Sequence, residues 1–306
     1  MNKLEANVSL FMITFFAAIQ YAFLAGVPAS VSHFAFLTIT NLIGFLIALC
    51  FFFGETFRID KKQIGQSILL AAELIAVNAC MLSGTSGTAA TVSACVMSAY
   101  FVFVPLLGFL VFREKPDKRT FPGIVIVLVG LFLMMNGDVA GLLNKNIFYL
   151  ILTDLFFALY ILTLGKLSAS SNPSILAMGQ MFFSALFSFV IWAVQSVFFG
   201  GSFQLPKDPA FWGGVIYISF FIRGLYGIVQ IYALRYVSPL NTSLIFSTEI
   251  VMTMLMSPVL VILFGTEPEV ITPVRVVGAL LMVAGILAAD PSVFETIGRR
   301  LAHEKK

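Results

Sequence analysis

SPLNTSLIFSTEIVMTMLMSPVLVILFG, residues Ser238–Gly265, is an almost entirely apolar stretch with one carboxylate, Glu249, near its middle. Its 28 residues exceed the roughly 20 that an α-helix needs to cross the hydrocarbon core of a bilayer. A carboxylate at that depth costs several kcal/mol, so it is expected to face a cavity, a partner or a substrate. The stretch therefore predicts a membrane-spanning helix that carries a functional acid.

A second copy of this pattern lies upstream, which indicates an internal duplication. Four pairs of residues match between the copies: Pro105 with Pro258, Glu114 with Glu267, Gly123 with Gly278, and Gly130 with Gly285. The offset is 153 residues for the first two pairs and 155 for the last two. We therefore expect two similar halves, residues 1–140 and 141–306.

The composition predicts an all-α polytopic membrane protein. Of the 306 residues, 59% are hydrophobic and 11% are charged, and the mean hydropathy is +1.00; soluble domains carry roughly 25% charged residues. The net charge of +3 is too small to indicate a nucleic-acid partner. Each span must satisfy its own backbone hydrogen bonds in lipid, which favours helices. Ten apolar segments are expected to form them, at residues 8–26, 33–53, 64–82, 86–112, 118–136, 147–167, 174–199, 211–235, 239–265 and 270–289.

Basic residues give the expected orientation. With the N-terminus in the cytoplasm, 14 lysines and arginines fall on the inner side and three, Lys145, Lys207 and Arg275, on the outer side. This bias predicts a multi-pass protein of the inner (plasma) membrane with both termini cytoplasmic. Five spans per half is an odd number, so the second half is expected to be inverted relative to the first. Inverted halves that rock about a central site are typical of secondary transporters.

Two runs resemble a known family. They are MLSGTSGTAATVSACVMSAYFVFVPLLGFLVFREKPDKRTFPGIVIVLVGLFLMM and VQIYALRYVSPLNTSLIFSTEIVMTMLMSPVLVILFGTEPEVITPVRVVGALLMVAGIL. Each is similar to the end of an EamA repeat of the drug/metabolite transporter superfamily. The resemblance implies a ten-helix inner-membrane carrier with a central cavity, in a family that includes amino-acid exporters and nucleotide-sugar carriers. The family's glutamate in the ninth helix matches Glu249. The family often continues Glu-Pro, whereas this chain has Glu249-Ile250 and a later Pro258.

Four ionisable side chains are predicted near mid-membrane: Glu73, Asp154, Arg223 and Glu249. Ionisable groups within spans are by default candidates for substrate or proton binding. Arg223 could hold a substrate carboxylate, and Glu249 could bind a proton or an amine. The alternatives are a fixed Arg223–Glu249 ion pair, backbone partners for the carboxylate, and an interfacial position for Asp154.

Polar and aromatic neighbours extend the candidate site. Arg223, Tyr226 and Gln230 recur at helical spacing and are expected on one face. Gln20 and Tyr21 lie late in the first span. Amides in spans also commonly join helix to helix, and aromatic rings commonly pack the core. Asn41, Tyr100 and Gln180 are weaker candidates for the same reasons.

Pro105 and Pro258 are candidate hinges, because proline removes a hydrogen bond from its helix; a static bend is the alternative.

The sequence has no zinc or Walker motif, so no metal or cofactor is expected. These features predict a secondary transporter of a small polar metabolite, such as an amino acid or amine. It is expected to work by alternating access in the lipid bilayer. Protons are a candidate coupling ion, and a homodimer is a candidate assembly. The alternatives are a membrane scaffold or sensor and an intramembrane enzyme. The short loops carry no paired carboxylates or histidines for the enzyme.

Overall fold

A computed structural model describes residues 2–25, 27–28, 30–86, 88, 90–113, 120–134, 144–201, 203–264 and 271–289. Within these ranges every regular element is a helix, which confirms the all-α prediction. Residues 2–134 are called the N-terminal part below, and residues 144–289 the C-terminal part. The expected boundary at residue 140 lies between them, outside the described residues.

The N-terminal part contains seven helical elements. They are α1 Lys3–Ala25, α2 His33–Phe52, the 3-10 helix η1 Phe53–Arg58, α3 Lys61–Thr85, α4 Ala90–Met97, α5 Tyr100–Phe112 and α6 Thr120–Met134. The C-terminal part continues with α7 Lys145–Ser170, α8 Pro173–Phe198, α9 Pro209–Tyr217, the π-helix η3 Ile218–Tyr226, α10 Gly227–Ala233, α11 Pro239–Ser247, α12 Glu249–Phe264 and α13 Pro273–Ala289. Each of the apolar segments expected from the sequence contains helix.

Among the described residues, seven helical stretches are long and apolar enough to cross a membrane. Three of them join consecutive elements: His33–Arg58 combines α2 with η1, Val92–Phe112 combines α4 with α5, and Pro209–Ala233 combines α9, η3 and α10. Two shorter apolar helices, Thr120–Met134 and Pro273–Gly285, accompany them. The chain is therefore a multi-pass membrane protein.

Local sequence explains where the helices begin. The Asp60 side chain accepts from the Gln63 amide, and the Gln63 side chain accepts in return from the Asp60 amide, so a capping box starts α3. Three helices of the C-terminal part start with a polar cap followed by proline, at Asn172-Pro173, Asp208-Pro209 and Ser238-Pro239. Proline fits the first helical position because the amide it lacks would have no helical partner there.

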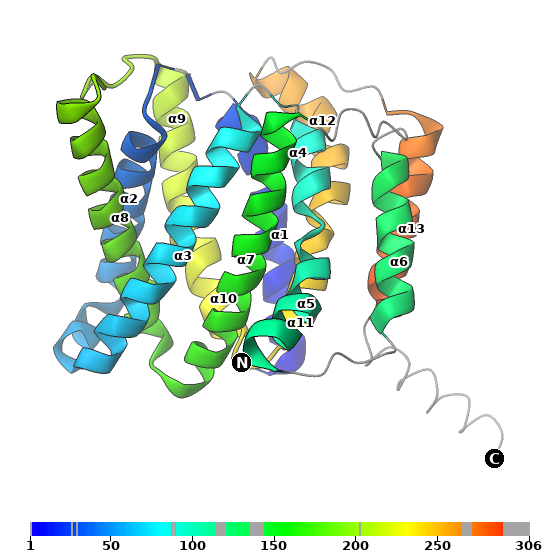
Figure 1. Cartoon of the computed structure of the whole chain (residues 1–306), viewed down its shortest axis with the longest axis horizontal. Coiled ribbons are helices and arrows are strands. Elements are labelled where there is room, and N and C mark those ends of the chain that lie inside the picture. Colours follow the sequence, from blue (N-terminus) through cyan, green and yellow to red (C-terminus); the bar gives the residue numbers. More distant parts are fainter. Residues whose placement is uncertain are drawn as a thin grey trace.

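The helix pairs that pack most closely join the N-terminal part to the C-terminal part. They are α6 with α13, α2 with α8, and α3 with both α7 and α8. Figure 1 shows α6 and α13 side by side at one edge of the molecule and α2 and α8 at the other, with α1, α3, α7 and α10 between. The two parts are thus interleaved along the whole molecule.

Matched glycines bring α6 and α13 together. A Cβ added at Gly130 would lie 2.7 Å from the Gly278 carbonyl oxygen, and one added at Gly278 would lie 2.7 Å from the Gly130 carbonyl oxygen. A Cβ at Gly285 would lie 2.8 Å from the Gly123 carbonyl oxygen. The glycines that indicated the duplication therefore form one interface, in which small residues allow close backbone approach.

Two spans are interrupted, and not at the prolines predicted as hinges. Residues Ser98 and Ala99 separate α4 from α5, and Thr248 separates α11 from α12. Pro105 lies within α5 and Pro258 within α12, where helix continues past both. The side-chain surroundings of Pro258 lie outside the described residues.

The two interruptions meet each other. The Ser247 hydroxyl donates to the Ser98 carbonyl oxygen at 3.2 Å, and the Tyr100 hydroxyl donates to the Ser243 carbonyl oxygen at 3.1 Å. Backbone groups freed within a membrane need such partners. The crossing therefore stabilises both interruptions, one from each part of the chain.

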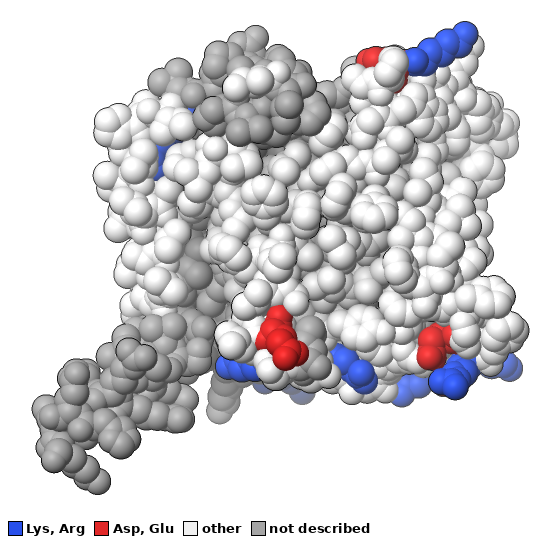
Figure 2. All heavy atoms as spheres, turned by 180° about the vertical axis from the view of Figure 1, so that it is seen from behind, with Lys and Arg blue, Asp and Glu red and all other residues white. Residues whose placement is uncertain are grey.

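Charged side chains gather at the two ends of the helices. Figure 2 shows basic residues along one edge and few elsewhere on that face. We call this edge the basic end; its described members are Lys3, Arg58, Lys61, Lys62, Arg113, Lys166 and Arg235. The opposite end carries Lys145, Lys207 and Arg275.

Candidate functional site

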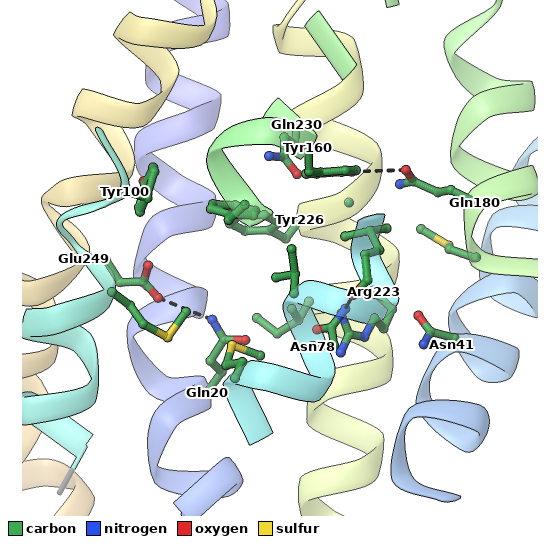
Figure 3. A pocket seen from close by; sticks show the side chains of 18 of the residues that line it. Gln20, Asn41, Asn78, Tyr100, Tyr160, Gln180, Arg223, Tyr226, Gln230 and Glu249 are labelled. Carbon is green, nitrogen blue, oxygen red and sulfur yellow. Dashed lines mark hydrogen bonds between the residues drawn. The ribbon is translucent and has the colours of Figure 1, made fainter. Parts of the chain in front are cut away.

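A central pocket lies among α1, α2, α3, α4, α5, α7, α8, η3, α10 and α12 (Figure 3). The volume of the pocket that the centre of a water molecule can occupy is about 90 Å³. One water needs about 10–15 Å³ on this measure, so the pocket has room for a small solute. Its polar lining consists of Gln20, Tyr21, Asn41, Asn78, Tyr100, Tyr160, Gln180, Arg223, Tyr226, Gln230 and Glu249.

Arg223 forms the positive wall of the central pocket. It lies in the π-helix η3, a rare geometry that is frequent at functional sites. Its side chain is only 8% exposed, and its Nε and Nη2 atoms have no hydrogen-bond partner among the described residues. A buried guanidinium with free donors can bind a carboxylate, which accepts two parallel hydrogen bonds.

Gly44 of α2 fixes the position of Arg223. A Cβ at this glycine would lie 2.5 Å from the Arg223 Cβ, a distance that real Cβ atoms do not adopt. The contact is to the first atom of the arginine side chain, next to the backbone, so it cannot be relieved by a change at the far end of that side chain. The absence of a side chain on Gly44 therefore lets η3 approach α2.

Glu249 forms the negative wall. It is the first residue of α12, directly after the interruption at Thr248, so its carboxylate lies near the positive end of a helix dipole. The Gln20 side-chain amide donates to Glu249 Oε1 at 3.4 Å, and Tyr21 lies beside the same carboxylate. Glu249 is 9% exposed. The interruption and α1 together position this acid at the pocket.

The two charged residues do not form the fixed ion pair considered from the sequence. Glu249 accepts a hydrogen bond from Gln20, whereas two nitrogen atoms of Arg223 have no partner. No ion pair joins the two charges in the described part of the chain. Figure 3 shows them on opposite walls, with Tyr226 between. The pocket thus offers separated positive and negative groups within one small space.

Amides and a tyrosine surround Arg223. The Asn41 and Asn78 side chains donate to carbonyl oxygens of their own helices, Leu37 and Leu74, at 2.8 and 2.6 Å. Their side-chain oxygens remain as acceptors. The Tyr160 hydroxyl donates to Gln180 Oε1 at 3.1 Å. This wall therefore carries neutral polar groups around one positive charge.

Six of the eight residues predicted to bind substrate or couple transport line the central pocket: Gln20, Tyr21, Arg223, Tyr226, Gln230 and Glu249. Glu73 and Asp154 do not. Glu73 accepts a hydrogen bond from the Thr163 hydroxyl at 2.9 Å, between α3 and α7. Asp154 is buried within the protein on α7. No cluster of His, Cys, Asp or Glu able to hold a metal ion occurs in the ranges described.

Sequence reasoning missed several lining residues. Asn78 is an amide in an apolar segment, the same signal that drew attention to Asn41. Tyr160 carries no distinguishing spacing. The apolar lining includes three methionines, Met81, Met97 and Met181. Methionine is common in protein cores, so its presence in an apolar segment does not indicate a site. Only the folded arrangement selects these residues from many similar ones.

Comparison with known proteins identifies the family. The model of the EamA-like transporter family matches residues 5–136 and again residues 144–289. The chain belongs to the EamA-like transporter family. This membership supports the prediction of a membrane transporter.

Two curated relatives of this EamA-like transporter are both described as uncharacterized transporters. One, from Archaeoglobus fulgidus, is 26% identical over 288 residues, covering 94% of this chain and 86% of the relative. Another, from Methanothermobacter thermautotrophicus, is 32% identical over 95 residues, or 30% of this chain and 28% of the relative. A solved crystal structure of a protein matches 98% of both chains with a TM-score of 0.68 at 13% identity, which supports the fold.

Proposed function

We propose that this EamA-like chain is a secondary transporter of a small zwitterionic metabolite, of the size of an amino acid. The observation that carries the proposal is the separation of Arg223 and Glu249 on opposite walls of one pocket. A zwitterion supplies a carboxylate for the free Arg223 nitrogens and an ammonium group for Glu249. Each charge of the solute would then replace lost hydration with a charge-assisted hydrogen bond.

The transport cycle is alternating access between two inverted five-helix repeats. Helices from both parts of the chain line the pocket, so a relative movement of the parts can expose it to either side. In this proposal all ten apolar segments cross the membrane. The free space in the pocket suits a small solute better than a sugar nucleotide.

Protons are the proposed driving ion, and Glu249 is the residue that exchanges them. Its carboxylate lies at the pocket, where it meets water whenever the pocket opens. A carboxylate in a membrane interior is costly unless it is paired. A proton and a substrate ammonium group are therefore alternative partners for the same acid.

The orientation follows from the basic end. We place this end in the cytoplasm of a cell with an inner membrane, together with both chain termini, because basic residues concentrate on the cytoplasmic side of such proteins. Cysteine replacement of Lys62 and of Lys207, followed by labelling with a membrane-impermeant reagent in intact cells, tests this. The placement requires labelling at position 207 and none at position 62.

The binding proposal is tested by a thermal-shift screen of the purified protein against amino acids, amines, organic acids and sugars at two pH values. A ligand that binds only the folded state raises its stability by RT ln(1 + [L]/Kd). We expect saturable stabilisation by a zwitterion, lost in Arg223→Gln and Glu249→Gln. Ser184→Ala is the control, because Ser184 is also buried but does not line the pocket. Stabilisation that survives both charge variants would contradict the proposal.

A further inference from the structure

Asp154 is the most deeply buried acid that the proposed cycle leaves unused. It lies in α7, is 1% exposed, and neither carboxyl oxygen has a hydrogen-bond partner among the described residues. An isolated charge in such a place is far more costly than a neutral carboxylic acid. The group is therefore neutral in the packed arrangement, because no described cation balances it.

Asp154 lies about one helical turn from a residue that lines the pocket. Phe157 is three residues further along α7, on the same helical face, and lines the pocket. The Tyr21 and Tyr100 hydroxyls also line the pocket, and each lies close enough to interact electrostatically with both Asp154 and Glu249. These two tyrosines thus lie in the same region as both acids.

The other helices packed on α7 bring no charge toward Asp154. Glu73 of α3 faces α7 at Thr163, more than two helical turns along from Asp154. Cys95 of α4 contacts the Leu131 carbonyl oxygen of α6, and Tyr232 of α10 bonds to Ser174 of α8. Tyr21 and Tyr100 are therefore the described titratable groups that interact electrostatically with Asp154, and burial keeps the acid protonated.

We propose that Asp154 is a second proton-binding site, separate from Glu249. It holds a proton while α7 is packed against the part of the pocket wall that contains Tyr21 and Tyr100, and it releases the proton to water when that part opens. α7 begins at the end opposite the basic end, and Asp154 lies nearer to that start than Phe157 does. Opening on that side would hydrate the acid. The inference rests on the proposed transport function, which supplies the opening.

Infrared spectroscopy of the full chain in liposomes tests the protonated state without any substrate. Protonated and ionised carboxyl groups absorb at different frequencies, and isotopic labelling of aspartate separates its bands from those of glutamate. We expect a protonated aspartate band at neutral pH that disappears in Asp154→Asn and persists in Glu249→Gln and Ser184→Ala. A wild-type protein without that band, or a band that survives Asp154→Asn, would overturn the proposal.

A flux measurement tests the release. Liposomes that contain a pH-sensitive dye are given a radiolabelled mixture of the common amino acids, and protons moved per solute are counted. We expect Asp154→Asn to lower the number of protons moved per solute while solute movement stays measurable. If the Asp154→Asn variant does not fold, Asp154→Leu is used in its place. An unchanged ratio would refute release from Asp154. If the wild type moves no amino acid, the transport proposal fails, and the infrared result still decides the protonated state.

Discussion

At the scale of single residues, the site depends on one contact between a glycine and an arginine. Gly44→Ala would place a methyl group 2.5 Å from the Arg223 Cβ, so η3 or α2 must shift. Overpacking of this kind costs about 1–3 kcal/mol of stability. We expect a lower melting temperature together with weaker stabilisation by carboxylate-bearing ligands, measured by thermal shift.

The control for this prediction lies in the same span as Arg223. A Cβ at Gly213 meets no atom within 4 Å, so Gly213→Ala adds the same methyl group without a clash. Alanine is better than glycine in a helix by about 1 kcal/mol, so this variant should be as stable as the wild type or more so. Equal behaviour of the two variants would show that Gly44 does not position Arg223.

All four neutral candidates, Gln20, Tyr21, Tyr226 and Gln230, line the pocket, whereas only two of the four charged candidates do. Glu249 and Arg223 stand out because charges are rare in apolar spans, and both line the pocket. Asn78 and Tyr160 do not stand out, because amides and tyrosines also serve ordinary packing. Asp154 and Glu73 give the same signal as Glu249 but lie outside the pocket, since depth along a span does not determine which way a side chain points.

At the scale of helices, the apolar runs predict where helix forms but not the irregularities within the helices. The segment expected at residues 211–235 is helical, but Ile218–Tyr226 adopts π geometry that hydrophobic periodicity does not indicate. The prolines predicted as hinges lie within helices, whereas the interruptions occur at Ser98–Ala99 and Thr248. Serine and tyrosine hydroxyls from the crossing helix stabilise these points, and such distant partners are invisible to local sequence.

The α6–α13 interface gives a prediction at this scale. Gly130→Ala would place its Cβ 2.7 Å from the Gly278 carbonyl oxygen, a backbone atom that can move only with its helix. We expect α6 and α13 to separate locally and the free energy of unfolding to fall by about 1–3 kcal/mol. Thermal unfolding compared with Gly65→Ala, whose new Cβ meets nothing within 4 Å, measures the difference. Equal stability of the two variants would contradict the close packing.

At the scale of the whole molecule, hydrogen bonds join the N-terminal and C-terminal parts at both ends. At the basic end the Asn172 side-chain amide donates to Glu55 Oε2 at 2.8 Å. At the opposite end the Ser32 hydroxyl donates to Gln195 Oε1 at 3.0 Å. Alternating access requires each connection to break in turn, so locking either end should stop transport.

Cysteine pairs test this requirement in a protein whose Cys50, Cys80 and Cys95 are first replaced. We expect oxidation of the pair Glu55→Cys with Asn172→Cys, or of Ser32→Cys with Gln195→Cys, to abolish flux in liposomes, and reduction to restore it. The control pair is His33→Cys with Ser83→Cys, which joins α2 to α3 within the N-terminal part, where the native side chains lie 3.4 Å apart. Full flux through either locked end would contradict alternating access between these parts.

The glycine contacts between α6 and α13 also limit how the sequences of the two copies can diverge during evolution. Gly130 lies in one copy and Gly278 in the other, and each limits the size of the residue that it faces. A larger residue at one of these positions therefore needs a compensating movement or substitution in the helix of the other copy. Although a single gene encodes both copies, they are constrained like the subunits of an obligate heterodimer, and at this interface they can diverge only together.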